Sequence, residues 1–103
     1  MVAVVYTTLG TMDDAKTIAH TLVKEKLVAC VNILPQVHSV YRWQGAIEEA
    51  AEVVLIAKTV DTNITATIQR IKKLHPYDLP DIIVLPITGG LKEYLEYIAD
   101  ETT

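Results

Sequence analysis

Apolar residues follow two different spacings along this chain, which predicts a domain of mixed helices and strands. Runs that are apolar on both faces at 2–7 and 82–87 predict two strands inside a covered sheet. Apolar residues three and four positions apart predict helices that start near Thr11, near Asp61 or Thr62, and after Gly89-Gly90. Thr11 and the acidic residues after it suit a helix N-terminus.

A long β-hairpin is predicted between the first two helices, over residues 28–59. Its two arms flank a turn at Gln44-Gly45, where glycine permits the positive φ of a tight hairpin. Each arm would span ~45 Å at ~3.3 Å per residue, whereas a compact chain of this size has a radius of gyration near ~13 Å. The outer half of the hairpin must therefore protrude. Pro35 predicts that the first arm is an edge strand or bends there.

The protruding half of the hairpin is apolar, and an isolated two-stranded ribbon is marginal in water. We therefore predict that another copy of the chain covers it. Tyr41 and Trp43 could in principle stack a nucleic-acid base, but the contact core of a protein interface is the better interpretation. The predicted oligomer-interface residues are Val37, Tyr41, Trp43 and Ile47.

The predicted element order βαββαβα is that of an α+β, ferredoxin-like split-βαβ sandwich, formed as a single domain over residues 1–103. In that arrangement the helices cover one face of a four-stranded sheet. Because the first and last strands are apolar on both faces, the uncovered face also needs a partner. This is a second argument for a homo-oligomer.

Composition and charge narrow the function classes. Lysine and arginine number 9 against 13 acidic residues, for a net charge of −4, which argues against a nucleic-acid partner. The single cysteine suits a reducing compartment. No apolar run approaches the ~20 residues of a membrane span, and the N-terminus lacks the basic region of a secretory signal.

Four segments together resemble the signature blocks of the CutA divalent-cation tolerance family. They are residues 29–32, 39–45 and 52–59 and, most specifically, His75-Pro76-Tyr77-Asp78-Leu79-Pro80-Asp81-Ile82. The resemblance implies a cytoplasmic homotrimer that binds copper or another divalent cation, and we expect a non-enzymatic role in divalent-cation tolerance. One copper site in the family combines a first-strand cysteine with a histidine pair before Pro-Tyr. Here Tyr6 and Leu74 occupy two of those positions, so only His75 remains.

The candidate metal ligands are His75 and Cys30. Imidazole is a common copper and zinc ligand, and a thiolate is the chain's one soft ligand. The alternatives are that His75 caps the helix before it and that Cys30 is buried packing. Glu48, Glu49 and Glu52 are predicted to be a solvated strand start, with Glu48 or Glu49 pairing with Arg42 across the hairpin.

A small-molecule site is the competing function. Polar residues at strand ends and in the rigid loop could form an intersubunit cleft for a small anion or metabolite, as in a PII-like sensor; they are Lys58, Tyr77, Asp78 and Thr88. PII-like proteins carry a long loop between their central strands, where this chain has the tight Gln44-Gly45 turn. An acylphosphatase-like hydrolase is disfavoured because residues 8–11 contain no arginine for an anion cradle.

Overall fold

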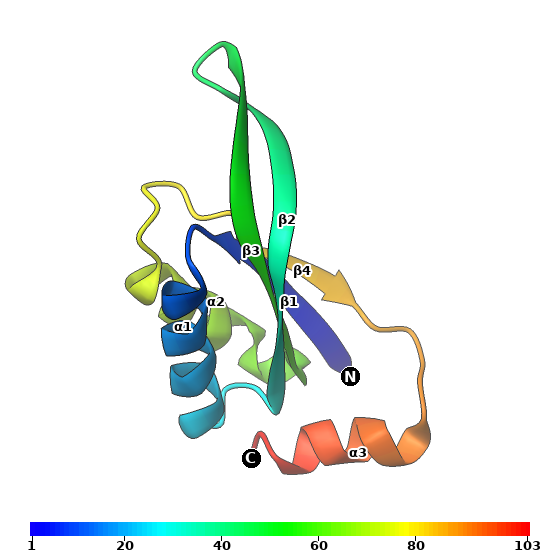
Figure 1. Cartoon of the computed structure of the whole chain (residues 1–103). Coiled ribbons are helices and arrows are strands. Elements are labelled where there is room, and N and C mark those ends of the chain that lie inside the picture. The colour runs from blue at the N-terminus through cyan, green and yellow to red at the C-terminus, as the bar shows by residue number, and fades with distance from the viewer.

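The computed structural model describes all 103 residues and shows a four-stranded antiparallel sheet with three helices (Figure 1). The strands are β1 (Val2–Leu9), β2 (Cys30–Trp43), β3 (Ala46–Val60) and β4 (Ile83–Pro86), in the order β2-β3-β1-β4. The helices are α1 (Met12–Lys24), α2 (Ile64–Leu74) and α3 (Lys92–Asp100), and a 3₁₀ turn, Asp61–Asn63, precedes α2. Every predicted strand and helix is present, and β2 is an edge strand as Pro35 predicted. None of the helices is long and apolar enough to cross a membrane.

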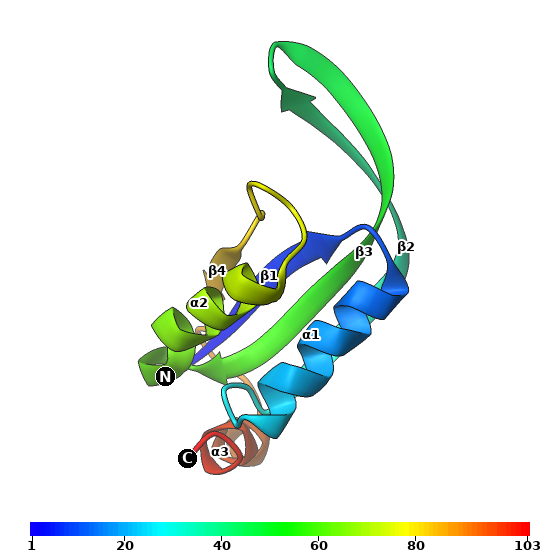
Figure 2. The same ribbon diagram turned by 90° about the vertical axis from the view of Figure 1, so that its left-hand side faces the viewer.

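Helices α1 and α2 lie side by side over one face of the sheet (Figure 2). Alternate residues of β1 and β3, among them Val5 and Leu55, point into this layer and are fully buried. Ile18 and Leu22 of α1 and Ile71 of α2 pack against them. Thr11 caps α1 by accepting a hydrogen bond from the Asp14 amide at 3.1 Å, as predicted.

Helix α3 does not join this layer, which corrects the expectation that the helices cover one face. Ile98 packs with Val2 and Ala29, and Tyr94 contacts Lys58. By strand alternation, Val2 and Lys58 belong to the face opposite Val5. Helix α3 therefore covers only the end of the second face, where β1 begins.

The rest of that second face, called here the open face, is apolar and uncovered. Ile83 and Leu85 of β4 lie on it beside Tyr6 and Val4, and they are 55% and 45% exposed. Leu34 of β2 lies on the same face and is also exposed. Exposed apolar surface of this extent is typical of an interface.

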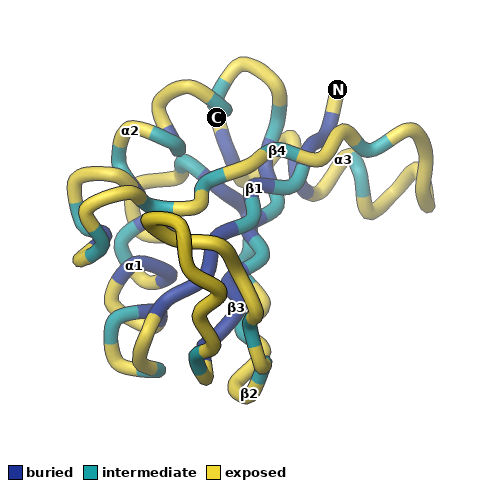
Figure 3. Tube along the Cα trace, turned by 90° about the horizontal axis from the view of Figure 1, so that it is seen from above, coloured by how far each residue is buried: buried dark blue, intermediate teal, exposed yellow.

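The β2–β3 hairpin extends well beyond the sheet and curves as it does so (Figures 1 and 2). The chain measures 44 × 25 × 23 Å, and its radius of gyration of 14.1 Å exceeds the ~13 Å of a compact chain. Gln44 and Gly45 have φ of 49° and 82°, as a type I′ turn requires. Most residues of the outer hairpin are exposed (Figure 3), and Val40, at 63%, and Ile47, at 69%, share the face opposite Glu52.

A β-bulge interrupts β2 at Pro35 and Gln36. Leu34 pairs with Val54 and Val37 pairs with Glu52, so β2 advances three residues while β3 advances two. The extra residue changes which side chains of β2 face each way. Beyond the bulge, Val37, Tyr41 and Trp43 therefore share the face of Glu52.

Candidate ligand-binding groove

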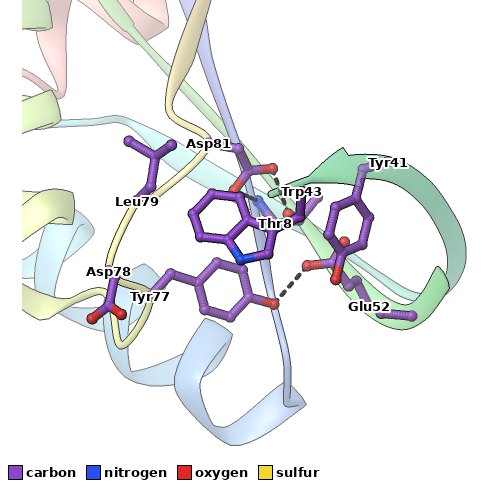
Figure 4. Close-up of a pocket in the computed structure, with 9 residues that line it drawn as sticks. Thr8, Tyr41, Trp43, Glu52, Tyr77, Asp78, Leu79 and Asp81 are labelled. Atoms are coloured by element: carbon purple, nitrogen blue, oxygen red, sulfur yellow. Dashed lines mark hydrogen bonds between the residues drawn. The ribbon is translucent and has the colours of Figure 1, made fainter. Parts of the chain in front are cut away.

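A groove of about 460 Å³ lies between the hairpin and the loop that joins α2 to β4 (Figure 4). The hairpin, the end of β1 and the loop each contribute to its walls. The bulge places the hairpin's aromatic residues on this side, and the two prolines that flank residues 77–79 restrict the loop. The lining residues are Thr8, Tyr41, Trp43, Ala50, Glu52, Tyr77, Asp78, Leu79 and Asp81.

Glu52 and Tyr77 join the hairpin to the loop across the groove. The Tyr77 hydroxyl donates to Glu52 Oε2 at 2.5 Å, and Glu52 is only 9% exposed. Burial opposes ionisation of this carboxyl, but hydrogen bonds from Ser39, Tyr77 and Thr8 outweigh it and lower the pKa of Glu52. Burial, and then the bond to Glu52, raises the pKa of Tyr77. Glu52 is therefore a fixed negative charge at neutral pH.

Asp81 is held at the opposite wall by the end of β1. Its Oδ2 accepts a hydrogen bond from the Thr8 hydroxyl, and its Oδ1 accepts from the Thr8 amide at 3.3 Å. The Thr7 hydroxyl adds a longer bond of 3.4 Å. These bonds fix the carboxylate of Asp81 beside Thr8, as Figure 4 shows.

His75 holds the loop in place. Its Nε2 lies 2.8 Å from the Thr8 carbonyl oxygen, and its Nδ1 accepts from the Tyr77 amide at 3.2 Å. The proton of a neutral imidazole therefore sits on Nε2. The ring also packs against the Tyr77 ring, with centroids 4.6 Å apart. His75, 7% exposed, thus sets where Tyr77 enters the groove; its side chain does not cap α2.

A second polar cluster lies on the second face of the sheet, at the end that α3 covers. Lys58 Nζ donates to the Tyr94 hydroxyl at 3.1 Å and lies 5.2 Å from the centroid of that ring. The Tyr94 hydroxyl is also 3.5 Å from Cys30 Sγ. The hydrogen bond to Tyr94 is the main cause of a raised pKa for Lys58. Cys30 is therefore half-buried beside a lysine ammonium, not packed in the core.

The two candidate metal ligands lie at opposite ends of the sheet. Cys30 pairs with Lys58, whereas His75 contacts Thr8, which pairs with Val54. Four residues of strand separate those positions, about 13 Å. Both nitrogens of His75 are already hydrogen-bonded, and a cationic lysine neighbours Cys30. The chain has no group of three or more His, Cys, Asp or Glu side chains that could hold a metal ion, so one subunit does not fit a copper or other divalent site.

The four predicted cleft residues are also divided. Tyr77 and Asp78 line the groove, Lys58 belongs to the cluster beneath α3, and Thr88 lines a separate hollow beside α3. A cleft that unites all four within one chain is absent. An intersubunit cleft of these residues stays a prediction.

The predicted interface residues and the acidic residues after the turn lie in different environments. Tyr41 and Trp43 line the groove of their own chain, Val37 is half-buried, and Ile47 is exposed. Glu52 was expected in a solvated strand start, but it is buried. Glu49 pairs with His38 at 2.6 Å, and Arg42 has no ion pair.

Sequence reasoning missed Thr8, Asp81 and Tyr94 as site residues. Asp81 was visible as the last acidic residue of the motif at 75–82, and alternation from Val2 places Thr8 on the open face. Their proximity was not visible, because 73 residues separate them. Tyr94 appeared only as part of an apolar helical stripe.

Comparison with known proteins gives consistent matches over the chain. The family model described as CutA1 divalent ion tolerance protein matches residues 3–101. The divalent-cation tolerance protein CutA of Thermus thermophilus is 44% identical over 102 residues, 99% of each chain. The chloroplastic protein CutA of Arabidopsis thaliana is 41% identical over 96% of this chain, which spans only 54% of that longer relative.

Solved structures agree with the fold. The Thermus thermophilus divalent cation tolerance protein has a TM-score of 0.97 at 44% identity, with both chains fully covered. A protein from Archaeoglobus fulgidus described as a periplasmic divalent cation tolerance protein has a TM-score of 0.96 at 36% identity, again with full coverage of both.

Proposed function

Because the chain belongs to the CutA1 divalent ion tolerance family, we propose that it acts in divalent-cation tolerance as a non-enzymatic homotrimer. The subunit is then a ferredoxin-like sandwich whose long hairpin wraps a neighbour. We place it in the cytoplasm, in keeping with its single free cysteine.

The observation that carries the trimer proposal is the uncovered apolar surface. Val40 and Ile47 on the outer hairpin, and Ile83 and Leu85 on the open face, are all about half exposed or more. A ribbon of two strands gains little stability alone. Packing against neighbouring copies removes both surfaces from water at once.

Light scattering and native mass spectrometry test this assembly. We expect a particle of three times the 11.4 kDa chain mass at micromolar concentration. Replacing both Val40 and Ile47 by aspartate should shift it to smaller species. Gln44→Asp, at the exposed hairpin turn, is the matched control and should leave the mass unchanged. A stable monomer of the unmodified chain would refute the proposal.

The hydrogen bonds of the two most reactive side chains support the proposal of non-enzymatic action. Cys30 has the Tyr94 hydroxyl as its hydrogen-bond partner, and the two ring nitrogens of His75 are hydrogen-bonded to Thr8 and Tyr77. A thiol nucleophile needs a base within hydrogen-bond reach. These two residues do not form such a pair.

Divalent-cation binding, with copper as the first candidate, then requires ligands from more than one copy. Cys30 is the better placed of the two predicted ligands, since it is half-buried on an edge strand, whereas His75 would have to break a hydrogen bond. Calorimetric titration of copper into the trimer and its Cys30→Ser and His75→Gln variants tests both. Unchanged affinity and stoichiometry in a variant removes that residue from the site.

A second candidate function is a PII-like trimeric sensor of a small molecule. The groove favours it, because its volume falls in the usual range of ligand pockets and Glu52 is fixed and charged inside it. A thermal-shift screen of small metabolites tests this candidate, since a ligand that binds the folded state stabilises it.

A further inference from the structure

The side chains that line the groove share one chemical character: they suit a positive charge. Three aromatic residues and three carboxylates line it, and the lining contains no lysine, arginine or histidine. The aromatic residues are Tyr41, Trp43 and Tyr77, and the acidic ones are Glu52, Asp78 and Asp81. Figure 4 shows that the three rings come from the hairpin and the loop, and that carboxylates flank them.

Aromatic faces carry partial negative charge and attract cations that are weakly hydrated. The attraction is strongest to tryptophan, here Trp43, and increases as water is excluded. Apolar atoms of Leu79 and Ala50 also line the groove and reduce its access to water. An ammonium ion with attached carbon groups matches this combination of rings, apolar atoms and negative charge.

The fixed carboxylates argue against a bare metal ion in the same place. Glu52 Oε2 already accepts from Tyr77, and both oxygens of Asp81 accept from Thr8. A hard cation requires several oxygen ligands in a defined cage, and an aromatic face supplies none. An organic cation needs only the field of the carboxylates and contact with the rings.

We propose that the groove between the hairpin and the residue 75–81 loop binds an organic ammonium ion, with Trp43, Tyr41 and Tyr77 as the aromatic walls and Glu52 as the main counter-charge. This proposal rests on the second candidate function, that of a small-molecule sensor, and names its ligand class. His75 is a positioning residue for the site, because it orients Tyr77.

Tetramethylammonium chloride is the probe, and Trp43 is the reporter, since it is the chain's only tryptophan. Titration of the oligomer of the 103-residue chain should give a saturable change in tryptophan fluorescence and a matching calorimetric isotherm. tert-Butanol, a neutral molecule of similar size and shape, should bind at least about tenfold more weakly because it lacks the charge. Sodium chloride at equal ionic strength should give no saturable signal.

Two variants test which residues are responsible. Glu52→Gln keeps the shape of the side chain and should weaken tetramethylammonium binding about tenfold. Glu49→Gln, an exposed change on the opposite face of the same hairpin, is the matched control. Trp43→Leu removes the ring face, and its binding is followed by calorimetry. Circular dichroism and light scattering confirm that each variant is folded and assembled.

Three results would overturn the proposal. These are equal binding of tert-butanol, equal binding by the Glu52→Gln and Glu49→Gln variants, and no binding by either calorimetry or fluorescence. The absence of binding is also the result expected if a neighbouring copy of the chain fills the groove. None of these results bears on the trimer or on copper, which mass measurement and copper titration decide separately.

Discussion

The hydrogen bond between Tyr77 and Glu52 joins the hairpin to the loop at 75–81 and should contribute measurably to the stability of the subunit. Tyr77→Phe deletes only the hydroxyl, which donates at 2.5 Å to a carboxylate that is 9% exposed. Hydrogen bonds to charged groups contribute about 1.5–3 kcal/mol. We therefore expect the free energy of unfolding to fall by roughly that amount, and the melting temperature of a domain this small to fall by about 6–24 °C.

The assay is chemical denaturation at one fixed protein concentration, arranged as a double-mutant cycle with Glu52→Gln. Tyr97→Phe, which removes a hydroxyl from an exposed ring on α3, is the control and should change stability by less than about 0.5 kcal/mol. We expect a coupling energy of about 1–3 kcal/mol between Tyr77 and Glu52. A coupling energy near zero would show that the two side chains do not interact in solution.

The pH dependence gives an independent check on the same bond. The pKa of Glu52 is lowered in the folded state, so its contribution to stability is present above the pKa of the unfolded carboxyl. That contribution is lost as pH falls through the folded pKa. The stability difference between the unmodified chain and Tyr77→Phe should therefore be largest near neutral pH and shrink in acid. A difference that is constant across this range would refute an ionised Glu52 as the acceptor.

Three further changes test the rest of the structure. Leu55→Ala, at a fully buried position of β3, should cost about 2–5 kcal/mol in denaturation experiments, whereas Ala51→Gly on the exposed outer strand should cost much less. Gly45→Ala should cost about 1 kcal/mol because φ is 82° there and the surrounding space is open, and Gln44→Asn should instead be neutral or stabilising. His75→Ala should cost about 1–3 kcal/mol and increase hydrogen exchange at the Tyr77 amide, since it removes that amide's acceptor; unchanged exchange would contradict the positioning role.

The fold could be predicted closely from the sequence because its signals are local. Alternation, cap residues and the Gln44-Gly45 turn each act within a few positions, and they gave the element order and the protruding hairpin. The position of α3 could not be predicted, because an apolar stripe does not say which face of a sheet it meets. The contact of Tyr94 with Lys58 could not be predicted for the same reason.

The site could be predicted only in part because its contacts are distant in sequence. Tyr77 and Asp78 were identified from the loop motif, and both line the groove. Glu52 was misplaced because two other glutamates near it are exposed and its own partner lies 25 residues away. Trp43 was expected at a subunit interface because the outer hairpin protrudes and is apolar. That role stays a prediction, and the groove that Trp43 lines in its own chain was not foreseen because it depends on the distant loop at 77–81.

The bulge at Pro35 and Gln36 determines which face of the hairpin each later side chain of β2 occupies. If β2 kept all its residues but paired regularly with β3 here, Val40 and Arg42 would face the groove in place of Tyr41 and Trp43. A longer or shorter hairpin keeps the same side chains in the groove only if two residues, or a multiple of two, are added or removed on both strands between the bulge and Trp43. Among relatives, the length of each hairpin arm should therefore differ by an even number of residues, while the extra residue of the bulge is kept.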